Sequence, residues 1–384
     1  MQSEYDFSTV PDRGNTGSMK WQKYAGRDVL PMWVADMDFV SPESIRKALL
    51  ERVGHGVYGY TVPYPSVEEA VLDYFRRDHG LTVEREWLVW MPGLVPALNA
   101  ATRAYGEQGD AVLTNTPVYP PFLSAPVWQG KSLQAVPLKL ECGHYRFDFA
   151  AMEAAVTERT RLFILCNPHN PVGRAWQQSE LEELVDFCRR HDLVVVSDEI
   201  HCDLILDRGI QHRPFLGLGE WARDHSLTLM APSKTYNVPG LACSFIVVPN
   251  PTLRRQLQQA ARGLITEVNC MGYVACEAAY RAGEPWRMAL LEVLRNNFAR
   301  LRERIQTEMP RIHLFHLEAT YLAWMDVRPL GLADPVAFFE EHGVGLSDGT
   351  LFGSPGFVRF NFGAPASMVE SALDRMAAAY HTLT

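Results

Sequence analysis

The chain has 384 residues, of which 47% are hydrophobic and 21% charged, proportions that are ordinary for a soluble globular enzyme. It is longer than most single hydrophobic cores allow, so we expect one large domain and one smaller one. The net charge of −9 argues against an extended phosphate-binding surface, which excludes nucleic acid as an expected partner.

Signals for membranes, disulfides and metals are missing from the sequence. No apolar stretch reaches about 18 residues, and the start at residues 1–6 shows no basic-then-apolar leader, so we expect a cytoplasmic protein with no membrane partner. The seven cysteines form no Cys-x-x-Cys pair, which favours free thiols in a reducing compartment. The twelve histidines show no ligand spacing, so no metal is expected.

The first segment, up to about Pro42, is rich in turn residues and has little periodicity. We expect it to lie over the junction between the domains without forming a core. The large α/β domain is expected over residues 43–283. Residues 1–42 and 284–384 are expected to form the N-terminal segment and a small C-terminal α+β domain.

A glycine precedes an apolar helical pattern near the start of the large domain. Backbone N–H groups at the start of a helix are suited to binding phosphate, and Gly93, Leu94 and Val95 fit this role. A lone glycine at such a position is also typical of an ordinary cap or turn.

Four unbroken apolar runs follow, each bounded by polar or turn residues. Such runs predict strands that are buried on both faces of a mostly parallel sheet. Between the second and third runs, Ser179 and Glu182 predict a capping box at the start of a helix. A strand, helix, strand succession predicts an α/β sheet that is wound right-handedly. The four runs cover residues 111–114, 161–166, 193–196 and 227–230.

From about Glu284 the pattern changes to long amphipathic helices, for example over residues 289–309. Short strands are expected after them, at 321–327 and 357–362. This pattern predicts the second, α+β domain.

Polar side chains follow three of the four predicted strands. Asn170, Asp198 and Lys234 come shortly after the second, third and fourth apolar runs. Ligands of such sheets bind outside the carboxyl ends of the strands, so we expect these side chains to meet there, together with Tyr119 after the first run. Each residue alone has an ordinary explanation, because Lys234 could extend into solvent and Asp198 could cap a helix.

Together, the three side chains match the needs of a pyridoxal phosphate ring. The ring requires an amine for its aldehyde, a carboxylate for its ring nitrogen and a hydrogen-bond donor for its phenolate oxygen. Desolvation at the mouth of a buried strand would favour the neutral, nucleophilic form of Lys234. The sequence therefore predicts pyridoxal 5'-phosphate as the cofactor.

Several segments resemble known families. CNPHNPVG at 166–173, SDEIH at 197–201 and SKTYNVPGL at 233–241 resemble the fold-type I pyridoxal-phosphate enzymes. LPMWVADMDF at 30–39 and YGYT at 58–61 narrow the resemblance to the MalY/PatB-type carbon–sulfur lyases, usually called cystathionine β-lyases. The match runs over nearly the whole chain and implies an α/β fold with a mostly parallel central sheet flanked by helices, plus a smaller α+β domain.

The resemblance implies a role for each residue at the strand ends. Lys234 would hold the cofactor aldehyde and act as the base at the substrate Cα, and Asp198 would keep the ring nitrogen protonated. Asn170 would donate to the phenolate oxygen, and His201 would donate to the same oxygen or pack behind it. Tyr119 would stack on the face of the ring.

The resemblance also implies a phosphate site that two subunits share. A tyrosine of the neighbouring subunit would reach the phosphate, with Tyr60 as the first candidate and Tyr58 as the second. A homodimer is therefore expected. Within one chain, the phosphate-binding set is Gly93, Leu94, Val95 and Ser233.

Arg359 stands in an otherwise apolar predicted strand. A buried arginine needs a partner, and a bidentate fit to the α-carboxylate of an amino acid is the functional option. An ion pair with an internal acidic residue is the structural alternative. The substrate-binding set implied by the resemblance is Arg359, the backbone of Ala35, Tyr119 and Asn170.

The implied function is a pyridoxal-phosphate-dependent β-lyase that cleaves L-cystathionine or related cysteine S-conjugates to a thiol, pyruvate and ammonia. One departure weakens the alternative of an aminotransferase on the same scaffold, because Ala242 stands where many aminotransferases place a phosphate-binding arginine. Ala231 likewise stands where relatives often have Ser or Thr. A regulator-binding protein with secondary lyase activity is a minor alternative. Candidate walls of the substrate side-chain pocket, each as well suited to a core, are Trp33, Tyr58, Tyr321 and Phe352.

Overall fold

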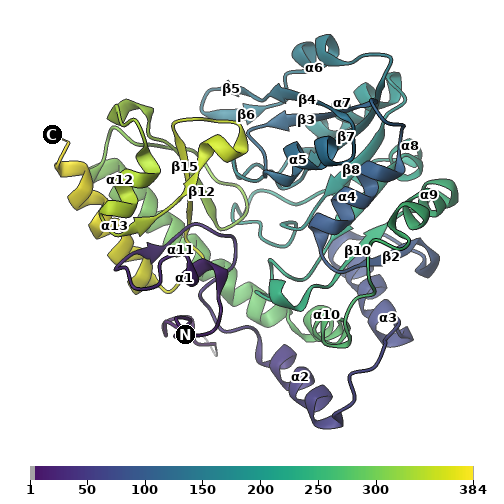
Figure 1. The fold of residues 1–384 in the computed structure, drawn as a ribbon, viewed down its shortest axis with the longest axis horizontal. Helices are drawn as coiled ribbons and strands as arrows, with labels where there is room; N and C mark the ends of the chain where they lie inside the picture. Colours follow the sequence, from purple (N-terminus) through teal and green to yellow (C-terminus); the bar gives the residue numbers. More distant parts are fainter. Residues whose placement is uncertain (1–4, 384) are drawn as a thin grey trace.

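The computed structural model describes residues 5–383. Residues 1–4 lie outside the described residues. The expectation that the chain starts without a leader depends partly on these residues. A larger lobe built on one sheet lies beside a smaller lobe that contains the C-terminal elements, and the N-terminal segment runs along the smaller lobe before the chain enters the larger one (Figure 1). Over the described range, no helix is long and apolar enough to cross a membrane.

Seven strands in the described part of the chain form the larger sheet. Strand β10 is antiparallel to both of its neighbours, whereas the other strands run parallel to one another. The prediction of a mostly parallel sheet is therefore confirmed. From one edge to the other, the strands are β2 (Leu88–Met91), β10 (Ser244–Val247), β9 (Ser226–Met230), β8 (Val194–Asp198), β7 (Thr160–Cys166), β3 (Ala111–Thr116) and β4 (Ser132–Pro137).

The apolar runs are buried on both faces because side chains alternate across a sheet. Leu162 and Ile164 of β7 pack into the core on one face, and Phe163 and Leu165 pack into the core on the other. The helices on the first face are α4 (Leu94–Ala104), α5 (Pro121–Trp128) and α9 (Pro251–Ala261). Those on the second are α3 (Pro65–Tyr74), α6 (Phe149–Ala155), α7 (Gln178–Arg190), α8 (Glu220–Asp224) and α10 (Cys270–Ala282), with α2 (Glu43–His55) against α10.

The predicted capping box of Ser179 and Glu182 is wrong. Helix α7 starts two residues earlier, at Gln178, and the box is formed by Gln177 and Glu180. A Glu180 carboxylate oxygen accepts the Gln177 N–H at 2.9 Å and also pairs with Arg174 at 2.6 Å. The ion pair with Arg174 holds Glu180 at the third helical position, and the local sequence pattern gives no sign of that contact.

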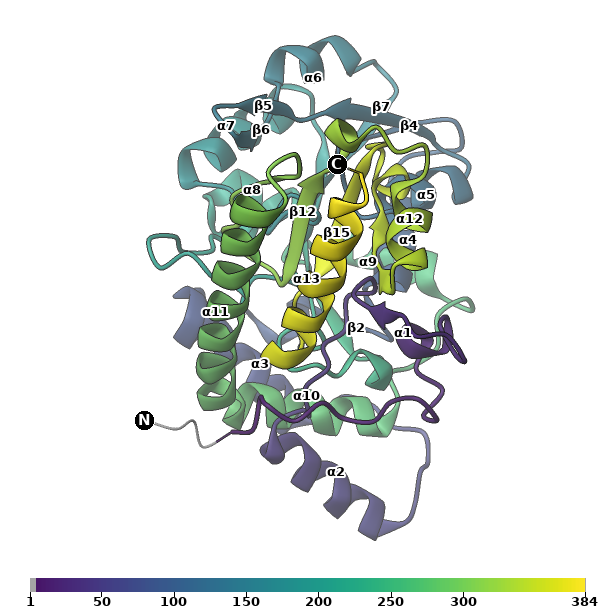
Figure 2. The same ribbon diagram turned by 90° about the vertical axis from the view of Figure 1, so that its left-hand side faces the viewer.

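Four strands of the described chain form a second, antiparallel sheet. The predicted strands at 321–327 and 357–362 are present as β12 and β15, and the predicted helix at 289–309 is the later part of α11. The division into domains at residues 42 and 283 stays a prediction. The sheet order is β11 (His313–Leu314), β12 (Leu322–Asp326), β15 (Phe357–Asn361) and β14 (Ser347–Asp348), and Figure 2 shows α11 (Glu284–Glu308) and α13 (Ala366–His381) across one face of it.

The expectation that the N-terminal segment forms no core is wrong. Phe7, Met32, Met37 and Phe39 are buried in the same cluster as the second sheet and α11. Their spacing follows neither the helical nor the strand period, so the sequence pattern did not reveal them. The small elements here and at the edges are α1 (Met19–Gln22), β1 (Leu30–Pro31) paired with β13 (Val344–Gly345), the hairpin β5 (Lys139–Glu141) and β6 (His144–Arg146), and α12 (Pro335–Glu341).

Candidate active site

A cavity of about 320 Å³ lies at the carboxyl ends of β7, β8 and β9. Its position agrees with the expectation for ligands of a parallel sheet, and its size is at the lower end of small-molecule sites. All but one of the predicted site residues line it. These are Ala35, Gly93, Leu94, Val95, Tyr119, Asn170, Asp198, His201, Ser233, Lys234 and Arg359.

The sequence prediction missed other residues that line the cavity. Cys166 is the last residue of β7, so the rule that found Asp198 at the end of β8 could have found it too. Cys243 precedes the antiparallel strand β10, which was not predicted, so no signal pointed to it. The other additional lining residues are Val34, Pro96, Ile200, Pro239 and Ala242.

Lys234 lies in the turn after β9 and is partly accessible through the cavity. The turn is closed by the Tyr236 N–H, which donates to the Pro232 carbonyl at 2.9 Å. The Lys234 amine donates to the backbone carbonyl of Ala35 at 2.6 Å. Desolvation, with a smaller contribution from the nearby Arg359 cation, lowers the pKa of Lys234 to about 8. The amine is therefore neutral in a useful fraction of molecules near neutral pH.

Asp198 ends β8 and is buried. Its Oδ1 accepts the Ile200 N–H at 3.1 Å. Burial raises the pKa of Asp198 to about 7, although this hydrogen bond and the charge of Lys234 oppose the rise. The residues that follow form turns, so Asp198 is not the cap of a helix.

Arg359 of β15 points into the cavity as a buried cation. It donates to the Asn170 side-chain oxygen at 2.9 Å, to the Trp33 carbonyl at 3.0 Å and to the Ser347 hydroxyl at 3.3 Å. All three acceptors are uncharged, and its Nε has no partner. Among residues 5–383, no acidic side chain forms an ion pair with Arg359, so the internal ion pair is not found. Burial lowers the pKa of Arg359 to about 10.

His201 and Tyr119 face the same cavity. His201 is buried, and desolvation holds its pKa well below the ordinary value, so the ring is neutral. The Nδ1 atom of this ring is buried without a hydrogen-bond partner. Burial also raises the pKa of Tyr119, which keeps its hydroxyl protonated.

The start of α4 also lines the cavity. Gly93 precedes the helix with φ +121°, a conformation that side-chain-bearing residues rarely adopt, and its N–H donates to the Ser244 hydroxyl at 3.2 Å. Leu94 and Val95 begin the helix beside it. Ala242, in a left-handed conformation, lines the cavity as well and brings no charge.

Tyr60 is the predicted site residue that the structure does not bring to the cavity. It lies in the loop between α2 and α3 and is fully exposed. Helix α2 and the loop that joins it to α3, residues 43–64, form an arm that exposes an unusual number of large hydrophobic side chains. They are Leu50, Val53, Val57, Tyr58, Tyr60 and Val62.

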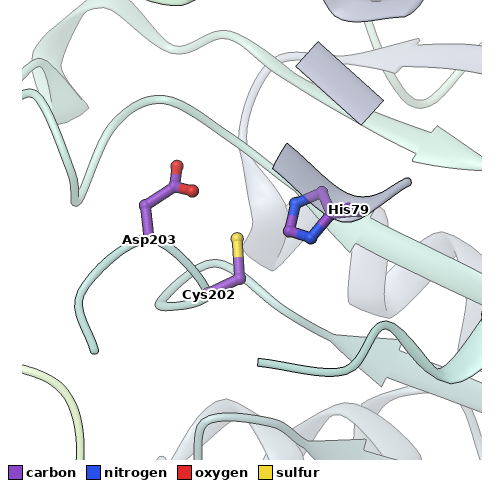
Figure 3. Close-up of side chains that lie close together, drawn as sticks. All are labelled: His79, Cys202 and Asp203. Atoms are coloured by element: carbon purple, nitrogen blue, oxygen red, sulfur yellow. The ribbon is translucent and has the colours of Figure 1, made fainter. Parts of the chain in front are cut away.

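One group of potential metal ligands in the described chain contains no residue that lines the cavity. Figure 3 shows His79, Cys202 and Asp203 close together, with ligand atoms within 4.8 Å of one another. The Tyr74 hydroxyl contacts all three, at 2.9 Å from His79 Nε2, 3.3 Å from Cys202 Sγ and 2.8 Å from Asp203 Oδ1. The phenol thus fills the position that an ion would take, and the group is a hydrogen-bonded network.

The comparison with known proteins gives the class of this chain. Residues 27–376 match the family model of the class I and II aminotransferases, so the chain belongs to that family. Cystathionine beta-lyase PatB of Bacillus subtilis (strain 168) is 38% identical over 97% of this chain and 99% of its own length.

Solved structures narrow the class. Cystalysin of Treponema denticola, whose structure contains a pyridoxal 5'-phosphate cofactor, has a TM-score of 0.95 with 32% identity, over 99% of this chain and 100% of that chain. The crystal structure of OvoB has a TM-score of 0.95 with 42% identity, over 97% of this chain and 98% of that chain. Within the aminotransferase family, the chain belongs to the MalY/PatB-type branch, as the sequence motifs indicated.

Proposed function

We propose that the chain is a pyridoxal-phosphate-dependent carbon–sulfur β-lyase that cleaves L-cystathionine or related cysteine S-conjugates to a thiol, pyruvate and ammonia. The observation that carries the proposal is the cavity in which a low-pKa amine, a buried carboxyl group and a guanidinium without an acidic partner meet. The similarity to cystathionine beta-lyase PatB over nearly the whole chain supports the choice of reaction.

The residues of the cavity fit the cofactor. The unpaired Nδ1 of His201 and the side chain of Asn170 can serve its phenolate oxygen, and Asp198 can serve its ring nitrogen. Backbone N–H groups at the start of α4 and the Ser233 hydroxyl can hold its phosphate without help from position 242. When bound, the cofactor supplies an electron sink for the negative charge that develops at the substrate Cα.

Lys234 and Arg359 would act on the substrate itself. Arg359 would bind the α-carboxylate through its free Nε and its fork, and this contact would provide the counter-charge that the cavity lacks. Lys234 would remove the Cα proton of the substrate, for which a pKa of about 8 is well suited. A thiolate is a good leaving group, so no further acid is required at Cβ.

We further propose that the active protein is a homodimer. An arm that exposes six large hydrophobic side chains in water is typical of a surface that another chain covers. Tyr60, in the loop between α2 and α3, would reach the phosphate site of the partner subunit, with Tyr58 as the second candidate. The free thiols of all seven cysteines support a cytoplasmic location.

The test is to incubate the purified protein with pyridoxal phosphate and L-cystathionine, without any keto acid. The proposal expects pyruvate and free thiol in equal amounts over many turnovers, and neither product with the Lys234→Ala control. Transfer of the amino group only after a keto acid is added, without thiol release, would instead identify an aminotransferase. A panel of S-substituted cysteines would then rank the substrates.

A further inference from the structure

The carbonyl oxygen of Ala35 receives two side-chain donors. The Lys234 amine donates to it at 2.6 Å, and the Tyr321 hydroxyl donates to it at 3.0 Å. The carbonyls on either side, of Val34 and Asp36, both accept from the Asn361 side-chain amide, at 2.6 and 2.7 Å. The Ala35 oxygen is therefore held in one orientation, facing the lysine.

The segment that carries this carbonyl is anchored beyond it as well. Asp38 is buried between Lys20 at 2.6 Å and Arg13 at 2.7 Å, and Arg13 also pairs with Asp36 at 2.8 Å. Buried charges paired in this way are costly to separate, so the segment cannot shift freely relative to Lys234.

Tyr321 is fixed by the second sheet. It directly precedes β12, and its carbonyl accepts the Phe362 N–H at 3.0 Å beyond the end of β15. In the same pair of strands, Trp324 stands opposite Arg359. One sheet thus supplies both the guanidinium in the cavity and the hydroxyl that touches the acceptor of Lys234.

We propose that Tyr321 is a positioning residue for Lys234. The Tyr321 hydroxyl and the Ala35 carbonyl hold the amine whenever it is not bonded to a carbonyl compound, and we call this pair the seat of the amine. This inference rests on the proposed function, because such a seat matters only if Lys234 is released during turnover. A carbonyl that already accepts a phenol proton is a poorer acceptor for an ammonium group. The seat therefore orients the amine and favours its neutral, proton-accepting form.

The protonation state of Tyr321 supports this role. Burial raises its pKa far above the ordinary value, so the phenol donates at every working pH. Other groups act on the amine from the surrounding elements, and each is unchanged in a Tyr321→Phe variant. They are Arg359 on β15, Asp36 in the N-terminal segment, Asp198 on β8, and the neutral His201 and Tyr119.

The test compares Tyr321→Phe with Tyr105→Phe. Tyr105 is a matched control because it is also buried and its hydroxyl also donates to a backbone carbonyl, that of Leu253 at 2.8 Å, away from the cavity. The first readout is the pH at which Lys234 is half-acetylated by acetic anhydride in the full-length, cofactor-free protein, measured by mass spectrometry of its peptide. The second is kcat and KM of the loaded enzyme across the pH range.

Loss of the phenol makes the Ala35 oxygen a stronger acceptor for the ammonium form. We expect the acetylation midpoint of Tyr321→Phe to rise by about one pH unit, which lowers the neutral fraction of the amine up to about tenfold below the midpoint. We expect kcat at pH 7 to fall by about threefold to tenfold and to recover at higher pH, while KM changes by less than about twofold. Tyr105→Phe is expected to match the wild type in both readouts.

An unchanged acetylation midpoint in Tyr321→Phe overturns the proposal, as does the same change in Tyr105→Phe. A loss of kcat that is equal at every pH also overturns it, because that result indicates a merely structural role. The acetylation readout needs neither cofactor nor substrate. Absence of lyase activity in the wild type would therefore refute the proposed function and leave the coupling of Tyr321 to Lys234 to be decided by acetylation.

Discussion

Replacing Arg359 by methionine tests whether this side chain binds the substrate carboxylate. The variant keeps an apolar stem of similar length and removes the charge. If the guanidinium binds the substrate carboxylate, two charge-assisted hydrogen bonds of about 1.5–3 kcal/mol each are lost, not fully additively. We expect kcat/KM to fall by about 10²- to 10³-fold, with cofactor content unchanged.

The same change has opposing effects on the stability of the cofactor-free protein. Burial lowers the Arg359 pKa to about 10, so loss of the charge removes a cost of about 3 kcal/mol. The three hydrogen bonds that are lost have a charged donor, for which about 1.5–3 kcal/mol each is typical, without full additivity. The hydrogen bonds outweigh the cost of burial, so the free energy of unfolding should fall by about 1–4 kcal/mol.

The assay is thiol and pyruvate release at varied substrate, with cofactor content from absorbance and stability from urea unfolding. Arg328→Met is the matched control. Arg328 lies on the same lobe and stacks over Phe357 at 4.7 Å, as Arg359 does over Phe352 at 4.7 Å, but it is exposed and already paired with Asp326. A kcat/KM for Arg359→Met within about threefold of the wild type, or a parallel loss of cofactor, would refute the assignment to the carboxylate.

Three other changes test the remaining parts of the site. Lys234→Ala should lose the visible absorbance of the bound cofactor and at least about 10³-fold of kcat, and retained colour would mean that another lysine is used. Asp198→Asn should lower kcat yet stabilise the cofactor-free protein above pH 7. The pKa of Asp198 in the folded protein is raised from 3.8 to about 7, so the stability that this carboxyl adds is complete below pH 3.8 and is lost as the pH rises through 7. Urea unfolding should therefore show the variant more stable than the wild type by up to about 4 kcal/mol above pH 7, and this difference should vanish at low pH. Mixing inactive Tyr60→Ala and Lys234→Ala chains should restore about a quarter of the wild-type activity if Tyr60 serves the partner's site, because half of the randomly paired dimers are hybrids with one intact site. No recovery, in mixtures whose subunits are shown to exchange, would place Tyr60 elsewhere.

The positions of Asn170, Asp198 and Lys234 could be predicted from the sequence because they depend on one strong regularity. Unbroken apolar runs become parallel strands, and parallel strands end at the same edge of the sheet. The same regularity could have found Cys166. It could not find Cys243, because an antiparallel strand brings its first residue, and not its last, to that edge.

Contacts that join distant parts of the chain had no such signal. Ala35 and Tyr321 are 286 positions apart, and each lies outside a regular strand. The resemblance supplied Ala35 as a backbone group for the substrate, whereas Tyr321 entered the prediction only as a possible wall or core residue. Its hydroxyl contact became visible once the antiparallel pairing of β12 with β15 fixed the position of the ring.

The charges of the cavity share one property that no sequence pattern contains. Burial shifts the pKa of Lys234, Asp198, Arg359 and His201 toward the neutral form in every case. A site in which all four charged forms are disfavoured lacks counter-charges, and a protonated ring nitrogen and an amino-acid carboxylate are the groups that would provide them for Asp198 and Arg359. Binding should therefore move both pKa values back toward their ordinary range, and the gain in stability on binding should exceed that of variants in which either residue is neutral. Part of the binding free energy would thus come from ligand groups that supply the missing counter-charges of Asp198 and Arg359. This explains why residues so costly to bury lie together at this edge of the sheet.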